Sequence, residues 1–369
     1  MGRLALIRGR LALAHACAAL ALAACSDPVA PRALPTSPNG LVVAAGPTVT
    51  AIGNILGNGI NDAGTIVGPS DGNRSSAYLW DTATGLKLVA TGGLAWDVSQ
   101  DGLTVGGKNA AGTPVLWTSA SVGGTRTEVA LPDAGFGGAV RSIVSDAGGA
   151  ALVLVGNVFT NGSNKTPARW SRCTLEPGCL NGWLLATVEP TPPITEAWGQ
   201  DVNAAGMIVG MEGTGCCRAA FWDSDGTQTV LTPLAAGAAA SAWGINDAGT
   251  LIVGQSNGAA VMWVRSNTTL PFAAPIRLDG GSCKSSASSI AYALNPDLES
   301  AGTIVGQTCG SPVAWKVNIA VSPPTVLRVM LPSTGKSTLG VAQSINRSTS
   351  SRHRIAGQVN GTGVYWTSF

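Results

Sequence analysis

Short apolar runs alternate with clusters of Gly, Asn, Asp and Ser over most of the chain. The runs have the length of strands, and several carry β-branched pairs such as Ile66-Val67 and Ile304-Val305. The polar clusters between them contain the residues that tight turns require. No stretch has the apolar spacing of a long amphipathic helix. The pattern predicts an all-β chain of many short strands.

One phrase recurs seven times after residue 40. It consists of an apolar residue, Asn or Ser, a Gly-containing turn, a β-branched pair, Gly, a polar loop, and then a Trp. The first copy is Ile60-Asn61-Asp62-Ala63-Gly64-Thr65-Ile66-Val67-Gly68, with Trp80. Each copy predicts four strands: A ends at the Asn or Ser, B runs through Ile-Val-Gly, C ends at the Trp, and D is the next apolar run. The copies lie at about 51–91, 92–132, 133–191, 192–234, 235–278, 279–331 and 332–369, the repeat length of propeller blades.

The two ends of the repeat region complement each other. The seventh copy stops at Phe369 before any D strand, and the apolar run Leu41–Ala45 stands unassigned ahead of the first copy. A closing strand at 41–46 would complete the last blade and remove an open sheet edge. The alternative, an open β-solenoid, would need polar caps at both ends. We therefore predict a seven-bladed β-propeller of four-stranded antiparallel blades over residues 41–369, closed by an N-terminal strand.

The repeated residues have expected structural roles. The Trp that ends each C strand should fill the space between blades and find a partner there for its N–H. The Asn-Asp-Ala-Gly segments should form the A–B turns. The Gly of Ile-Val-Gly is expected to end strand B at a tight bend.

The repeat phrase also resembles a known family. Asn-Asp-Ala-Gly-x-Ile-Val-Gly followed by Ala-x-x-Trp is similar to the HAF repeats of extracellular bacterial proteins, named for a His-Ala-Phe before the Trp. That place reads Ser76-Ala77-Tyr78 in the first copy and Arg218-Ala219-Ala220-Phe221 in the fourth, so the His is missing. The resemblance covers residues 41–369. It implies an exported repeat protein and no particular activity.

The N-terminus has the pattern of a bacterial export signal over residues 1–24. Arg3, Arg8 and Arg10 precede an apolar run that is too short to anchor the chain across a bilayer. It ends in Leu22-Ala23-Ala24-Cys25, which resembles a lipobox and implies that the Cys25 thiol is acylated after cleavage. The alternative is an ordinary signal peptide cleaved near Ala24. Residues 25–40, rich in Pro, Ser and Ala, are expected to form a flexible tether. Ser26 favours an outer-membrane or cell-surface lipoprotein, held to the membrane through Cys25.

Six cysteines follow Cys25, and an even number in an exported chain predicts disulfides. Cys173 and Cys179 lie in one C–D insertion, so we expect a local bond. Cys283 precedes strand A of the sixth repeat and Cys309 follows its strand B, on loops that share one face of a propeller. Cys216-Cys217 form either a vicinal disulfide or a pair of reactive thiols.

The remaining residues offer little chemistry. A net charge of +2 with no Lys/Arg cluster argues against a nucleic-acid partner. His353 is the one histidine after the signal, so it cannot form a multi-His metal site, and we expect a surface turn residue. We predict no catalytic set, metal or cofactor. Carboxylates on the predicted top-face loops are scattered over the blades without repeated pairing: Asp71, Asp133, Glu189, Glu196, Glu212 and Asp279.

A ligand would be expected at the mouth of the central channel, where a propeller has a preformed cleft. Trp96, Trp243 and Tyr292 each stand three residues before the Asn or Ser of strand A, and Gln200 and Gln343 take the same place. Such a set can stack on a sugar ring and hydrogen-bond its hydroxyls. The alternative is that this position packs between blades. We predict a monomeric, exported binding module for a glycan, peptide or envelope partner. The alternative function is a hydrolase or lyase acting on an extracellular polymer.

Overall fold

The computed structural model describes residues 47–367 except for 71–74, 162–163, 189, 191–193, 214–216, 281–282, 284–288, 296–297, 299, 335–338 and 348–352. Residues 45–369 form one compact unit. Over the described residues the regular elements are 28 strands. This part of the chain contains no helix that is long and apolar enough to span a membrane.

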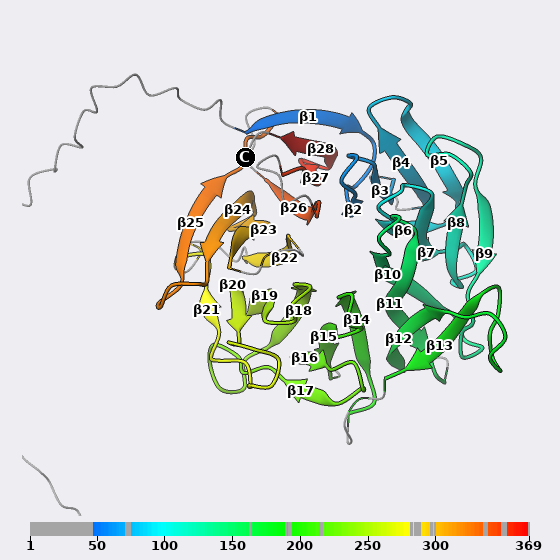
Figure 1. Cartoon of the computed structure of the whole chain (residues 1–369). Helices are drawn as coiled ribbons and strands as arrows, with labels where there is room; N and C mark the ends of the chain where they lie inside the picture. Colours follow the sequence, from blue (N-terminus) through cyan, green and yellow to red (C-terminus); the bar gives the residue numbers. More distant parts are fainter. Residues whose placement is uncertain are drawn as a thin grey trace, which may run out of the picture. The chain divides into compact units, whose positions relative to one another are not determined.

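The strands form seven four-stranded antiparallel sheets, the blades, arranged around a central axis (Figure 1). Blade 1 contains β2 (Gly59–Ile60), β3 (Ile66–Pro69), β4 (Ser76–Asp81) and β5 (Gly85–Thr91). Blade 2 contains β6 (Leu94–Val98), β7 (Thr104–Lys108), β8 (Pro114–Thr118) and β9 (Thr127–Ala130). Blade 3 contains β10 (Gly138–Ser145), β11 (Ala151–Phe159), β12 (Lys165–Arg172) and β13 (Trp183–Thr187).

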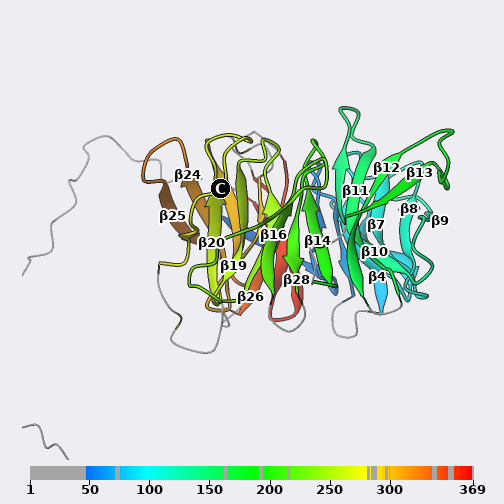
Figure 2. The same cartoon turned by 90° about the horizontal axis from the view of Figure 1, so that it is seen from below.

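The next three blades follow in chain order. Blade 4 contains β14 (Ala197–Val202), β15 (Ile208–Glu212), β16 (Arg218–Trp222) and β17 (Gln228–Val230). Blade 5 contains β18 (Ala240–Ile245), β19 (Leu251–Ser256), β20 (Ala259–Val264) and β21 (Ile276–Arg277). Blade 6 contains β22 (Ile290–Leu294), β23 (Ala301–Thr308), β24 (Ser311–Asn318) and β25 (Thr325–Met330). Figure 2 shows the sheets from the side, with the loops gathered on two faces.

Blade 7 combines both ends of the described chain. It contains β26 (Gly340–Ile345), β27 (Ile355–Val359), β28 (Thr362–Thr367) and, on its outer edge, β1 (Thr48–Gly53). β1 pairs antiparallel with β28, with Thr48 opposite Thr367. The predicted seven-bladed propeller, closed by an N-terminal strand, is therefore confirmed.

The closing strand differs from the predicted one in position. It is Thr48–Gly53, whereas the predicted segment 41–46 lies outside the described residues. Residues 51–53, assigned to the first repeat from sequence, consequently belong to the last blade. The physical reason is that the outer strand buries only Ile52, so an apolar run is a poor guide to its position.

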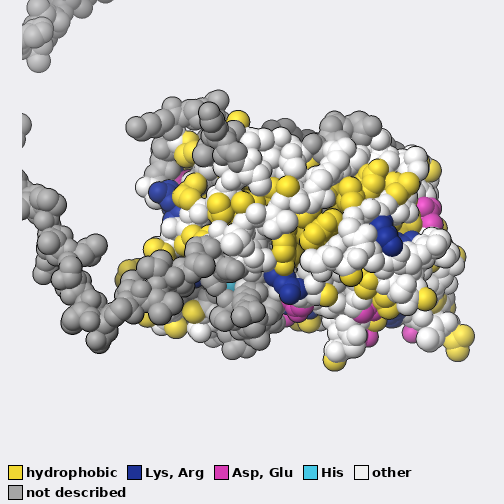
Figure 3. Space-filling model, turned by 90° about the horizontal axis from the view of Figure 1, so that it is seen from above, with side chains coloured by type: hydrophobic (Ala, Val, Ile, Leu, Met, Phe, Trp, Pro, Cys, Tyr) yellow, Lys and Arg dark blue, Asp and Glu magenta, His cyan; other side chains and the backbone are white. Residues whose placement is uncertain are grey.

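Outer strands are also where apolar side chains reach solvent. Leu88 of β5 is 55% exposed and Leu327 of β25 is 63% exposed. Figure 3 shows one flank of the ring, on which hydrophobic side chains form a band with few charged groups. Hydrophobicity thus predicts these strands without predicting their burial.

The C-strand tryptophans confirm the predicted packing between blades. In six blades this Trp is at most 2% exposed, and only Trp80 of blade 1 is half-buried. Trp263 of blade 5, for example, packs with Val209 and Phe221 of blade 4. The indole N–H groups of Trp170, Trp263 and Trp366 donate to backbone carbonyls just after the D strand of the preceding blade, those of Pro132, Thr232 and Pro332. Each of these rings therefore fastens its blade to the one before.

The turn asparagines fasten blades in the opposite direction. Asn203 is 1% exposed, and its side-chain oxygen accepts the N–H of Met207 within its own A–B turn. Its side-chain amide donates to the carbonyls of Asn246 and Asp247 in the next blade. Asn61 and Asn295 make the same type of bond across to blades 2 and 7. These residues are turn formers, as predicted, and they are also bridges between blades.

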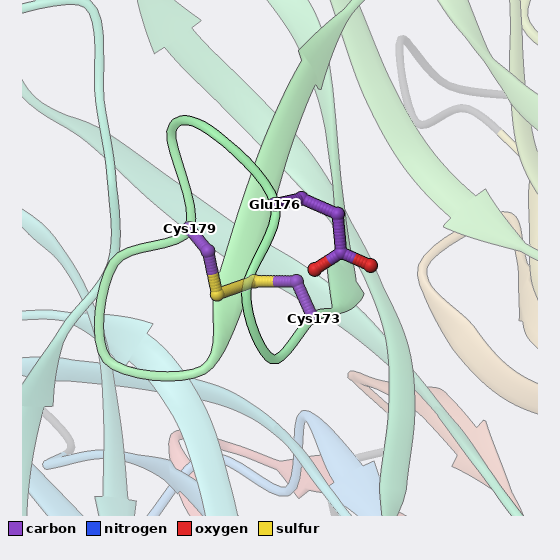
Figure 4. Close-up of side chains that lie close together, drawn as sticks. All are labelled: Cys173, Glu176 and Cys179. Carbon is purple, nitrogen blue, oxygen red and sulfur yellow. A yellow bond between two sulfur atoms is a disulfide. The ribbon is translucent and has the colours of Figure 1, made fainter.

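Two of the predicted disulfides are present. Cys173 bonds Cys179 in the loop between β12 and β13, and Cys283 bonds Cys309 in blade 6. Figure 4 shows Glu176 beside the first bond, where its carboxylate accepts the N–H of Thr174 at 2.9 Å. Both sulfurs are consumed in the disulfide, so this loop offers no thiolate to a metal. Cys217 is half-buried, and Cys216 lies outside the described residues, so their pairing stays a prediction.

Candidate binding site in the central channel

The innermost strands of the blades surround a cavity of about 440 Å³. This volume lies within the range of about 300–1,000 Å³ that small-molecule sites occupy. Every blade contributes one half-buried polar or aromatic side chain, six from the innermost strand and one, in blade 1, from the residue just before β2. We call these side chains the channel ring: Asn58, Trp96, Arg141, Gln200, Trp243, Tyr292 and Gln343.

A β-bulge produces the ring position in six blades. In blade 4, Gly199 pairs with Gly210 and Asp201 pairs with Val209, so Gln200 has no partner on β15. The same register shift leaves out the ring residue in blades 2, 3, 5, 6 and 7. A bulge redirects the side chain of the extra residue. Here it redirects each one into the channel, away from the space between blades.

The Gly of Ile-Val-Gly makes this bulge possible. A Cβ on Gly210 would lie 1.7 Å from the carbonyl oxygen of Trp198, and one on Gly254 would lie 2.0 Å from that of Ser241. Any side chain at this place would collide with the bulged strand. Gly210 pairs with Ala220 in the middle of β15, so the expectation that these glycines end strand B at a bend was wrong.

All five sequence-predicted ligand residues line the cavity as members of the channel ring. Sequence reasoning missed Arg141, because it stands four residues before Ser145, whereas the other ring residues stand three before their Asn or Ser. Counting back three residues from Ser145 therefore gives Ser142. Asn58 was also missed, although the same count from Asn61 identifies it.

The ring contains two aromatic contacts. Trp243 and Tyr292 meet edge to face at 5.3 Å, and the Trp243 indole N–H donates to Ser241 Oγ. On another side of the channel, the Arg141 guanidinium lies over the Trp96 ring, 4.3 Å from its centroid. Gln343 Oε1 is buried without a hydrogen-bond partner. The ring thus combines apolar stacking surfaces with polar groups whose bonding capacity is unused.

Two carboxylates stand one residue further along the innermost strands. Asp97 accepts the N–H groups of Val98 and Ile143 at 2.8 and 2.7 Å, which ties blade 2 to blade 3. Asp201 accepts from Ser142 Oγ and from the N–H of Ile245, which ties blade 4 to both neighbours. Loss of hydration raises the pKa of Asp97 to about 7, although the hydrogen bonds from those N–H groups act to lower it. Loss of hydration also raises the pKa of Asp201.

An ion pair crosses the channel. Arg347 of blade 7 contacts Asp247 of blade 5 at 2.5 Å, although these blades are not adjacent. Both residues follow the asparagine of an A–B turn, four residues along the chain from the ring residue of the same blade, and both line the same cavity as the channel ring. The cavity is therefore bridged by charge on its A–B-turn side.

Of the carboxylates considered from sequence, those that the structure describes do not line the channel cavity. Asp71 and Glu189 lie outside the described residues, and the other four do not line the cavity. Glu212 pairs with Arg218, and Asp279 pairs with Arg277. His353 is a half-buried turn residue beside Asn295, and burial lowers its pKa. Two acidic residues that line the channel, Asp97 and Asp201, are instead on strands and were not predicted from the sequence.

No protein-family model matches this sequence, and no curated protein matches it. Solved structures do resemble it. The β-propeller domain of Cps50 (Swd1) from Myceliophteria thermophila is 11% identical, with a TM-score of 0.52, and the match covers 88% of this chain and 99% of that one. An oligogalacturonate lyase in complex with manganese is 13% identical, with a TM-score of 0.50, covering 87% and 90%. Such low identities establish the fold alone.

Proposed function

We propose that this protein is an exported, membrane-anchored binding module that takes a glycan into its central channel. The observation that carries the proposal is the channel ring itself. Seven repeats contribute three aromatic side chains, three amides and one guanidinium to the lining of one cavity. Aromatic faces suit the apolar faces of sugar rings, and amides can both donate to and accept from hydroxyls.

Unused bonding capacity supports a ligand over a purely structural role. Buried polar atoms are normally hydrogen-bonded, and those left unpaired call for an explanation. Gln343 Oε1 and Arg141 Nε are both unpaired, and both residues line the same cavity. A polar ligand that enters the channel would supply partners.

The export and anchoring part of the proposal rests on the sequence. A signal over residues 1–24 and acylation of Cys25 would place the propeller at the outer membrane or cell surface, as the likeness to HAF repeats also implies. Mass spectrometry of the mature N-terminus tests this directly. A diacylglyceryl group on Cys25 supports the anchor, whereas a chain that starts with an unmodified Cys25 or Ser26 contradicts it.

A glycan array on the purified propeller tests the binding function, followed by titration of the strongest ligand. Trp243→Ala should weaken that binding at least tenfold, because the aromatic side chain on which a sugar ring can stack is lost from the channel. Phe136→Ala is the matched control, since Phe136 is 55% exposed and does not line the cavity. Equal loss from both variants, or from neither, argues against the channel as the site.

A hydrolase or lyase acting on an extracellular polymer is the second candidate, and one observation favours it. A carboxyl group whose pKa is raised to about 7, as in Asp97, can exchange a proton at neutral pH. Both Asp97 oxygens are engaged by backbone N–H groups, however, which gives the residue a structural role. Release of reducing ends or unsaturated products from a polysaccharide panel, lost in Asp97→Asn, would establish this candidate.

A further inference from the structure

Arg141 is a cation in the channel without a protein counter-ion. None of its nitrogens has a hydrogen-bond or ion-pair partner among the described residues, and Nε is fully shielded from solvent. Burial lowers its pKa to about 10, with no carboxylate contributing, so the group is still charged at neutral pH. An uncompensated charge in such a place is costly unless something pairs with it.

Trp96 holds this guanidinium in the channel. The Arg141 Cζ lies over the Trp96 ring, 4.3 Å from its centroid. The N–H groups of a guanidinium form a flat fork. The fork matches the two coplanar oxygens of a carboxylate, which it binds through two parallel hydrogen bonds.

The other charged groups of the channel are already engaged. Arg347 is paired with Asp247 at 2.5 Å, so the channel ring contributes a single available positive charge. The oxygens of Asp97 and Asp201 accept N–H and O–H groups of the neighbouring blades. One cation with a planar donor fork suits a monoanionic carboxylate better than a phosphate, whose charge and tetrahedral oxygens call for several donors.

We propose that the channel ring selects an acidic sugar, a uronic acid residue of a polysaccharide, whose carboxylate pairs with Arg141 while its ring contacts the aromatic side chains. This inference rests on the proposed glycan-binding function and makes its ligand class specific. Amides on the same level, those of Gln200 and Gln343, are available for the hydroxyls, whereas the Asn58 amide already donates to the carbonyl of Ala95.

The test uses matched acidic and neutral ligands. Trimers of galacturonate, glucuronate and mannuronate are titrated calorimetrically into the purified propeller beside their methyl esters, which keep the ring and lose the charge. At least one acid should bind about tenfold or more tightly than its ester, the usual effect of a charge-assisted pair. Arg141→Gln should remove this preference, so that acid and ester bind the variant with equal affinity. Arg141→Lys, which keeps the charge without the fork, should retain only part of it.

Lys316→Gln is the control, because Lys316 is exposed on β24 and does not line the cavity. The substitution removes one positive charge, as Arg141→Gln does. It should leave the preference unchanged, and thermal melting of each variant verifies the fold. Equal affinity for acid and ester, or stronger binding of sulfated or phosphorylated trimers, overturns the uronate assignment while glycan binding stands. If no trimer binds and the glycan array is also blank, the proposed function itself fails.

Discussion

The bridge that Asn203 forms between blades 4 and 5 leads to a quantitative prediction. Asn203→Asp keeps the size of the side chain and the acceptor for the Met207 N–H at 3.0 Å. It removes the two donors that reach the carbonyls of Asn246 and Asp247, both at 3.2 Å. Each lost bond costs about 0.5–1.5 kcal/mol, and an oxygen now faces oxygens in a site that is 1% exposed. We expect the free energy of unfolding to fall by about 2–4 kcal/mol at neutral pH.

The same variant should show a characteristic pH dependence. Burial beside carbonyl oxygens raises the pKa of the introduced carboxyl in the folded state above its unfolded value. Its destabilisation should therefore be smallest at acidic pH, where the protonated group can donate one hydrogen bond, and should grow as pH rises through the raised pKa.

Urea unfolding followed by tryptophan fluorescence, from pH 4 to 8, measures both effects. Asn267→Asp is the control, because the exposed Asn267 uses only its side-chain oxygen, toward Thr269. It should change stability by less than about 0.5 kcal/mol. If Asn203→Asp is as mild as this control, the asparagines do not hold the blades together and the interpretation is wrong.

Three further predictions follow from the fold. Gly254→Ala, whose Cβ would lie 2.0 Å from Ser241 O, should lower the free energy of unfolding by more than about 3 kcal/mol. The control Gly148→Ala, in an exposed turn, should lower it by about 1 kcal/mol or less. Urea unfolding midpoints measure both, and similar losses would disprove the bulge argument. Because burial raises the pKa of Asp97 in the folded state to about 7, stability should fall as pH rises from about 4 toward 7. Asp97→Asn should flatten this part of the stability profile. An unchanged slope in the variant would show that Asp97 does not cause the pH dependence. Replacing both Cys283 and Cys309 by Ala should lower the free energy of unfolding by about 3 kcal/mol. This loss should exceed that from removing Cys173–Cys179, because the sequence separations are 26 and 6. The reverse order in unfolding experiments would contradict this entropic estimate.

The sequence predicts the architecture well because each blade repeats the same local requirements. Asn at the A–B turn, Gly opposite the bulge and Trp between blades are each demanded by a contact that recurs around the ring. The outer strands have no such requirement. β1 buries a single side chain, Ile52, which is why the sequence placed the closing strand too early.

The candidate site was predictable only as far as the repeat is regular. Five ring residues follow from their distance to the Asn or Ser of strand A. Arg141 does not, because β10 has one more residue between the bulge and the Ser of its turn, which only strand pairing reveals. Asp97 and Asp201 were missed for another reason. They lie on strands and not on the loops where catalytic or binding carboxylates are usually sought.

Hydroxyl-radical footprinting, read by mass spectrometry with and without the strongest glycan ligand, tests the central claim most directly. We expect the ligand to protect Trp96, Trp243 and Tyr292 in the channel from oxidation, with no change at Phe136 or at Met330 on the outer strand β25. Protection of Phe136 or Met330 with an unprotected channel would contradict it and would place the binding surface on the outside of the propeller.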